Sequence, residues 1–182
     1  MKAQALAILD VVLFTPAVHG DDRGFFMESF NVSAFEEATG FKQSFVQDNH
    51  SRSQKGVLWG PHYQLPPHAQ GKLVRVTRGA VFDVAVDIRR SSPSFGLWVG
   101  HVLSEDNKLQ LWIPPGFAHG FLTLSDTADF LYKTTDLYTP QCERSIALND
   151  RDLAVEWPYE YTPGLSEKDL AASTFKQAEV FD

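Results

Sequence analysis

Short runs of alternating apolar and polar residues, separated by turn-forming residues, extend along most of the chain. Three such runs, typical of β-strands, follow one another over residues 57–64, 71–78 and 80–87. Side chains alternate between the two faces of a strand, so Lys72 is expected to share a face with Val74 and Val76. Burying a cation is costly unless it is paired or bound to a ligand. Lys72 is therefore either a site residue that points into a partly apolar interior or a strand-end lysine whose amine reaches water.

The same pattern predicts further strands over residues 6–14, 25–30, 45–52, 95–103, 108–113, 118–124 and 128–138. A short helix is expected from Ser33 to Thr39, because Ser33 and Glu36 fit a capping box and Gly40 suits the C-terminal cap. A second helix start is expected at Ser166, with Asp169 at its third helical position. Roughly ten short strands with only two short helices indicate an all-β fold, an antiparallel barrel or sandwich.

Composition narrows the class of protein further. A chain of 182 residues suits one domain, residues 1–182. Its net charge of −7 argues against general affinity for nucleic acid or an anionic membrane, although it allows a local basic pocket. The single cysteine, Cys142, forbids an intrachain disulfide. The sequence has neither a signal-peptide pattern nor an apolar run long enough to cross a bilayer, so a cytoplasmic location is expected.

Two histidines are candidates for chemistry. A lone histidine such as His62 or His119 in an apolar strand is more often a hydrogen-bonded core residue, but two at corresponding strand ends of a barrel favour a shared cavity. Tyr132 is interpreted either as a core residue with its hydroxyl at the rim or as an acid–base group. Asp169 is interpreted either as a helix-terminal carboxylate or as the partner that orients a histidine.

A catalytic metal is not predicted. The segment 115–119 resembles the second half of the cupin signature, and 60–64 occupies the place of the first. Metal-binding cupins usually carry a second histidine two residues after the first and then a glutamate, whereas this chain has Gln64 after His62 and lacks the acid. Two histidines without a carboxylate do not form the site expected for iron or manganese.

Matched segments in order along nearly the whole chain resemble the dTDP-4-dehydrorhamnose 3,5-epimerase family. They cover residues 20–30, 45–51, 70–75, 81–89, 112–121 and 130–133. The resemblance implies a cupin-type double-stranded β-helix, or jelly-roll barrel, with a few short helices. It also implies a homodimer. The early strand over residues 6–14 is a candidate to pair with the other subunit, because an edge strand needs cover.

The resemblance implies a cofactor-independent epimerase of dTDP-L-rhamnose and polysaccharide biosynthesis. The substrate would be dTDP-4-dehydro-6-deoxy-D-glucose, whose C4 ketone acidifies the hydrogens at C3 and C5. His62 would be the base, oriented by Asp169; Tyr132 would be the acid, and Lys72 would stabilise the enolate. The substrate-binding residues implied are Arg23, Phe26, Glu28, Gln47, Asp48, Asn49, Trp59, Lys72, His119, Tyr138, Glu143 and Lys168, some of them from the partner subunit.

One departure from the family pattern lies directly before the expected base. Where the family has Leu-Arg-Gly-Leu-His, this chain has Leu58-Trp59-Gly60-Pro61-His62. Losing a charged hydrogen bond to a ligand typically costs about 1.5–3 kcal/mol. Weakened activity, a mono-epimerase or a 3,4-ketoisomerase acting on a related dTDP-4-keto-6-deoxy sugar are therefore alternatives. A carbohydrate-binding module without chemistry and a metal-dependent cupin are the rival classes.

Overall fold

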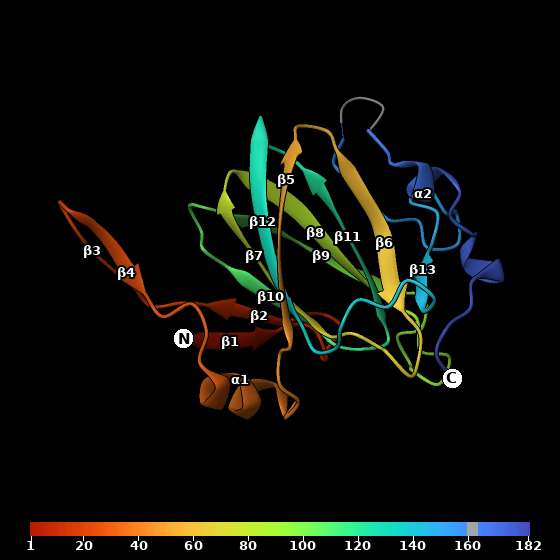
Figure 1. Cartoon of the computed structure of the whole chain (residues 1–182), viewed down its shortest axis with the longest axis horizontal. Coiled ribbons are helices and arrows are strands. Elements are labelled where there is room, and N and C mark those ends of the chain that lie inside the picture. The colour runs from red at the N-terminus through yellow and green to blue at the C-terminus, as the bar shows by residue number, and fades with distance from the viewer. Residues whose placement is uncertain (160–163) are drawn as a thin grey trace.

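The computed structural model describes residues 1–159 and 164–182, which form two facing β-sheets and a projecting hairpin (Figure 1). The first sheet has the strand order β1 (Lys2–Ala5), β2 (Val12–Thr15), β10 (Gln110–Ile113), β7 (Lys72–Arg78), β12 (Thr127–Thr134), β5 (Gln47–Gln54). The second has the order β13 (Glu143–Ser145), β6 (Leu58–Gln64), β11 (Phe117–Thr123), β8 (Ala80–Asp87), β9 (Trp98–Ser104). Neighbouring strands in both sheets are antiparallel, which confirms the predicted all-β class.

The main core lies between the two sheets. Val74 and Val76 of β7 meet Ala85 of β8 and Phe121 of β11 there, and each of these side chains is buried. The predicted alternation in β7 is confirmed, because Leu73 packs on the opposite face of the sheet. The alternation in β8 is confirmed as well, since Val84 and Val86 belong to a different cluster from Ala85.

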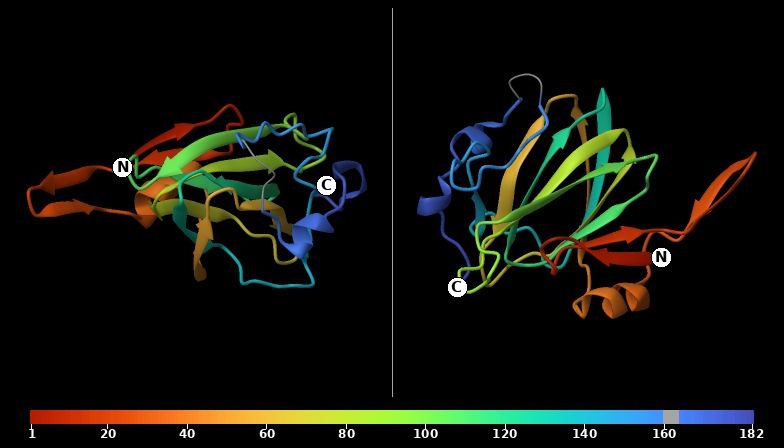
Figure 2. Two further views of the ribbon diagram at one scale, coloured as in Figure 1. Left: turned by 90° about the horizontal axis from the view of Figure 1, so that it is seen from above. Right: turned by 180° about the vertical axis from the view of Figure 1, so that it is seen from behind.

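A second core covers the outer face of the five-stranded sheet. The chain after β13 folds back across this face and places Leu153, Trp157 and Ala178 against Val84 and Val86. Figure 2 shows this C-terminal portion, in blue, lying alongside one sheet in both views. It contains α2 (Glu167–Leu170) and the 3-10 turn η1 (Phe175–Gln177). This packing brings α2 beside β6, although the two elements are far apart in the sequence.

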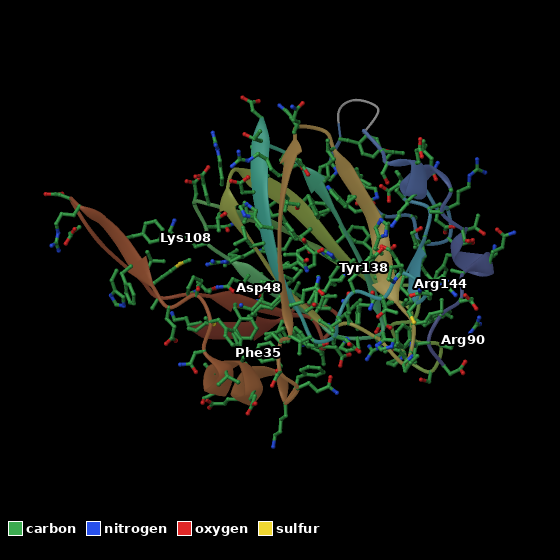
Figure 3. The ribbon with its side chains drawn as sticks, in the orientation of Figure 1. Phe35, Asp48, Arg90, Lys108, Tyr138 and Arg144 are labelled. Carbon is green, nitrogen blue, oxygen red and sulfur yellow. The ribbon has the colours of Figure 1, made fainter. Side chains whose placement is uncertain are left out.

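The helix α1 (Val32–Thr39) packs against the outer face of the six-stranded sheet. Its Phe35, labelled in Figure 3, is buried in a third, aromatic cluster. The centroid of the Phe35 ring lies 4.9 Å from that of Trp112. The predicted Gly40 cap is confirmed by a left-handed φ of 68°, which suits glycine. The predicted Ser33 cap is wrong. Asn31 caps the helix instead, because its side chain accepts a hydrogen bond from the backbone N–H of Ala34 at 3.1 Å.

The expected strand over residues 6–14 is also wrong in its bounds. The chain forms two antiparallel strands here, β1 and β2, joined by a turn that the hydrogen bond from Leu6 N to Val11 O closes at 2.9 Å. The apolar residues 6–9 form the turn rather than a strand, and the turn buries Ile8 in the core between the sheets. The remaining predicted strands are present, with ends shifted by several residues.

The hairpin of β3 (Val18–Asp21) and β4 (Gly24–Met27) projects from the body of the molecule (Figure 1). Phe25 and Phe26 on this hairpin are 60% and 71% exposed, which is unusual for two adjacent phenylalanines. Its contact with the body includes the amine of Lys108, which lies 4.3 Å from the centre of the Phe25 ring. Among the described residues, no helix has the length and apolarity needed to cross a bilayer.

Candidate active site

A cavity of about 670 Å³ opens between the two sheets. Strands β5, β7 and β12 form one wall, β6 and β11 the other, and the segment around α2 closes the mouth. Ten of the predicted site residues line it: Gln47, Asn49, Trp59, His62, Lys72, His119, Tyr132, Tyr138, Glu143 and Lys168. The structure therefore brings together residues that are up to 121 positions apart in the sequence.

His62, which lines the cavity, forms a pair with Asp169 of α2. Its Nε2 lies 2.8 Å from Oδ1 of Asp169, which also accepts the backbone N–H of Gly60 at 3.1 Å. The other carboxylate oxygen accepts the Ser166 hydroxyl at 2.7 Å. It also accepts the backbone N–H of Ser166 at 3.4 Å, while the Ser166 hydroxyl accepts the backbone N–H of Asp169 at 3.2 Å, which is the predicted capping box of α2. Partial burial would raise the pKa of Asp169, but these hydrogen bonds and the charge of His62 hold it below its usual value. Asp169 is thus a helix-terminal carboxylate that also contacts His62.

Lys72 points into the cavity, as its shared face with Val74 and Val76 predicted. Burial lowers its pKa to about 8, although the negative charges of Asp83 and Glu143 oppose that shift. Its amine donates a hydrogen bond to the backbone carbonyl of His62 at 3.3 Å. A lysine with a pKa of about 8 is still mostly protonated at neutral pH, so this group places a positive charge inside the cavity.

His119 and Asp83 form a second, deeper pair. Nε2 of His119 lies 2.9 Å from Oδ2 of Asp83, and both side chains are buried. Burial lowers the pKa of His119, against the opposing charge of Asp83, and burial raises the pKa of Asp83. His119 also pairs directly with His62 in the register of β6 and β11. Asp83 did not figure among the predicted residues, although a charged residue on the inward face of an apolar strand was the signal that drew attention to Lys72.

Tyr132 is half-buried in the wall formed by β12. Burial raises the pKa of its hydroxyl, and the nearby charge of Glu143 raises it further. The phenol is therefore protonated at neutral pH and able to donate a proton into the cavity. Its ring packs near Phe130, with centroids 6.0 Å apart.

Three predicted residues form a hydrogen-bonded group at the mouth of the cavity. Glu143 accepts from the hydroxyl of Tyr138 and from the amine of Lys168, each at 2.8 Å. Tyr138, labelled in Figure 3, is 47% exposed. A partly exposed ring beside a cation suits a ligand that carries a flat ring and a negative charge.

Trp59 begins a series of aromatic rings, here called the aromatic wall, that runs from β6 and β11 to β12 of the opposite sheet. Its indole stacks on Phe121 at 6.1 Å between centroids, and Phe121 stacks on Phe130 at 4.2 Å. The indole N–H donates to the hydroxyl of Ser53 at 3.0 Å, which fixes the ring. Phe121 and Phe130 were not predicted as site residues, because an aromatic residue in a strand normally indicates only core packing.

Four predicted residues lie outside the cavity of their own chain. Arg23 and Phe26 belong to the projecting hairpin, and Glu28 follows it; all three are exposed. Asp48 lies on β5 and forms an ion pair with Lys133 at 2.9 Å on the outer face of the sheet. Within one copy of the chain, these four do not join the group around His62.

The arrangement of potential metal ligands can be compared with the sequence-based expectation that there is no catalytic metal. Across residues 1–159 and 164–182, no three His, Cys, Asp or Glu side chains are grouped so that they could hold a metal ion. The position two residues after His62 is Gln64, whose amide donates to the backbone carbonyl of His68 at 2.7 Å. Its side chain is thus engaged in holding a loop.

Comparison with known proteins agrees with this architecture. A relative from Pseudomonas aeruginosa, dTDP-4-dehydrorhamnose 3,5-epimerase, is 62% identical over 181 residues, covering 100% of this chain and 99% of the relative. The crystal structure of dTDP-6-deoxy-D-glucose-3,5-epimerase from Legionella pneumophila, in complex with dTDP-4-keto-L-rhamnose, matches with a TM-score of 0.95 and 52% identity over 98% of this chain and 94% of that one. A 3'-monoepimerase from Streptomyces bikiniensis, in complex with dTDP-quinovose, matches with a TM-score of 0.89 and 34% identity over 94% and 87%.

The family model for dTDP-4-dehydrorhamnose 3,5-epimerase matches residues 5–177. The fold is of the cupin type, as the resemblance implied. The match spans both sheets, the projecting hairpin and the segment that carries Asp169. On this evidence, the chain belongs to the dTDP-4-dehydrorhamnose 3,5-epimerase family of isomerases.

Proposed function

We propose that this protein converts dTDP-4-dehydro-6-deoxy-D-glucose to dTDP-4-dehydro-L-rhamnose in dTDP-L-rhamnose biosynthesis, as a cytoplasmic, single-domain enzyme. The observation that carries the proposal is the convergence of His62, Lys72 and Tyr132 on one cavity, with Asp169 bound to His62 at 2.8 Å. Family membership at up to 62% identity supports the same activity.

In this mechanism His62 removes a proton from carbon next to the C4 ketone. Asp169 accepts a hydrogen bond from Nε2, so the free Nδ1 lone pair faces the substrate, and the carboxylate stabilises the imidazolium that forms. The electrons of the broken C–H bond move onto the ketone oxygen, where the ammonium of Lys72 stabilises the enolate. Tyr132 then donates its proton to the same carbon from the opposite face, which inverts the centre.

Residues at the mouth would bind the nucleotide. Tyr138 presents a half-exposed ring that is able to stack on thymine, and the Lys168 ammonium would neutralise part of the diphosphate. Gln47 and Asn49 lie side by side on β5, linked by a 2.9 Å hydrogen bond, and offer amide groups to the sugar or base. His119 would contact the sugar from the deeper part of the cavity.

We further propose that the protein is a homodimer in which the projecting hairpin of one copy reaches the cavity of the other. The exposed Phe26, the exposed cation of Arg23 and the neighbouring Glu28 find no cavity in their own chain, and a hairpin with two exposed phenylalanines suits an interface. The N-terminal strands β1 and β2 would lie at the same interface, as would Asp48.

Mixing two inactive variants tests the dimer. Arg23→Ala loses a hairpin contact, and His62→Ala loses the base. If the hairpins are exchanged, a mixed dimer contains one site with both groups intact, so activity returns on mixing to about a quarter of the wild-type level. A mixture as inactive as its components, from proteins that sediment as dimers, would contradict the exchange.

A second candidate is a mono-epimerase, which the segment Trp59-Gly60-Pro61 favours. Tryptophan lacks the guanidinium of the family arginine, so a sugar held less firmly presents one carbon to His62 rather than two. The test is proton NMR of the substrate with this protein in deuterated water. Exchange at C3 and C5 supports the double epimerase, exchange at one carbon the mono-epimerase, and binding without exchange a non-catalytic binding module.

A further inference from the structure

A second carboxylate lies beside the proposed base. Whereas Nε2 of His62 contacts Asp169, Nδ1 on the cavity side lies 3.7 Å from Oε1 of Glu143. Strand β13 pairs with β6 so that Glu143 lies opposite Gln64 and Ser145 opposite His62. This register fixes Glu143 next to the one ring nitrogen that is free to exchange a proton with a substrate.

Glu143 is held through only one of its two oxygens. Oε2 accepts the hydrogen bonds from Tyr138 and Lys168, while in the described part of the chain Oε1 has no hydrogen-bond donor and faces His62. The side chain of Lys168 is 65% exposed, so the carboxylate connects the interior of the cavity to solvent. A gap of 3.7 Å is closed by a small rotation of the carboxylate or by one bridging water.

The proposed reaction requires such a connection. Each inversion leaves His62 with an added proton and Tyr132 as a phenolate, so neither group is ready for the second carbon. The proton has no exit through Asp169, whose side chain is 3% exposed and whose second oxygen is occupied by Ser166. A double epimerisation therefore needs another acceptor near Nδ1.

We propose that Glu143 is the proton outlet that resets His62 between the two inversions. The Nδ1–H bond of the imidazolium breaks, the proton forms an O–H bond with Oε1 of Glu143, and the lone pair on Nδ1 is restored. Glu143 then releases the proton to water at the mouth, and the Tyr132 phenolate takes one proton from water. The sequence consumes no other reactant, and it deepens the proposed epimerase function, on which it rests.

The charge state of Glu143 suits a transient carrier. Partial burial would raise its pKa, but the hydrogen bonds and charge of Lys168, the hydroxyl of Tyr138 and the charge of His62 outweigh burial and lower it. The group rests as a carboxylate and passes a bound proton on quickly. A group meant to store the proton would show the opposite shift.

The test compares full-length wild type with Glu143→Gln, which keeps the shape of the side chain but accepts no proton. In deuterated water at saturating substrate, the variant is expected to slow exchange at the second carbon about tenfold or more relative to exchange at the first, so that a mono-epimerised sugar accumulates. Raising the imidazole buffer concentration at constant pH and ionic strength should accelerate the second exchange in the variant and leave wild type unchanged.

Two further variants serve as controls. Glu143→Asp keeps a carboxylate and is expected to recover much of the second exchange rate, and Glu179→Gln, which removes an exposed carboxylate paired with Arg144 outside the cavity, should match wild type. Equal rates for both carbons in Glu143→Gln, or a change confined to KM, would overturn the outlet. If wild type itself exchanges neither carbon, the epimerase function fails and the outlet fails with it.

Discussion

Gly60 offers a direct way to disturb the pairing of His62 with Asp169 without touching either residue. A Cβ atom at position 60 would lie 2.6 Å from Oδ1 of Asp169, whereas ordinary contact begins near 3.4 Å. The carboxylate must therefore move by about 0.8 Å in Gly60→Ala. A shift of that size directed away from His62 lengthens the 2.8 Å contact to about 3.6 Å, beyond hydrogen-bonding range.

The expected loss follows from the bond that is broken. A hydrogen bond to a charged group contributes about 1.5–3 kcal/mol, so kcat should fall roughly tenfold to more than a hundredfold. Because the same carboxylate caps α2, we also expect a loss of about 1 kcal/mol in the free energy of unfolding. NMR-monitored turnover measures the first quantity, and denaturant unfolding measures the second.

Gly164→Ala is the matched control. Its added Cβ would come no closer than 3.7 Å to Val57 and needs no rearrangement. Turnover of Gly60→Ala within about twofold of wild type, or an equal loss in Gly164→Ala, would refute the argument that the position of the Asp169 carboxylate limits the reaction.

Three other changes give separate expectations. Tyr132→Phe removes the proposed proton donor, so inversion should slow by about 10²–10⁴ while deuterium still enters the unreacted epimer by exchange at His62, as NMR would reveal. Trp59→Arg restores the cation of the family pattern and should lower KM about tenfold or more; an unchanged KM would mean that the aromatic wall has taken over its role. Asp87→Asn should cost about 2–4 kcal/mol of stability, because the buried carboxylate binds Arg89 at 2.7 Å. Burial opposes ionisation of Asp87, but hydrogen bonds from Arg89 and two serines hold its pKa at about 2, below the ordinary value of 3.8. The stability that the Asp87 carboxylate contributes is therefore present above about pH 4 and is lost towards pH 2. Wild type should lose stability across that interval more steeply than Asp87→Asn, which acid titration of unfolding would detect.

The central strands and the inward side of Lys72 were predictable from the sequence, because two-residue periodicity states directly which side chains share a face. The helix cap was missed by two positions. Asn31 and Ser33 both have side chains able to cap, and the choice depends on where the preceding aromatic residues pack. The early strand was missed in the same way, since an apolar run serves equally well in a turn that supplies Ile8 to the core.

In the candidate site too, individual residues were predictable from the sequence, whereas their contacts with distant residues were not. The histidines, Lys72 and Tyr132 were proposed from strand position and from family resemblance, and they do meet in space. The partnership of His62 with Asp169 required the C-terminal segment to fold back over the sheet, which no local pattern encodes. Asp83 was missed because its partner, His119, lies 36 positions away on a neighbouring strand.

Asp169 both contacts His62 and caps α2, so the geometry of the proposed catalytic pair depends on a single turn of helix. Helix α2 has four residues, and isolated turns of this length are marginal in water. When this turn frays, the carboxylate leaves His62 even though both sheets remain intact. Local opening of this kind has its own, smaller free energy than global unfolding. On warming, activity is therefore expected to disappear at a temperature below the melting temperature of the β-sheets, and to return at once on cooling. Amide hydrogen exchange at Asp169 would report the same opening equilibrium.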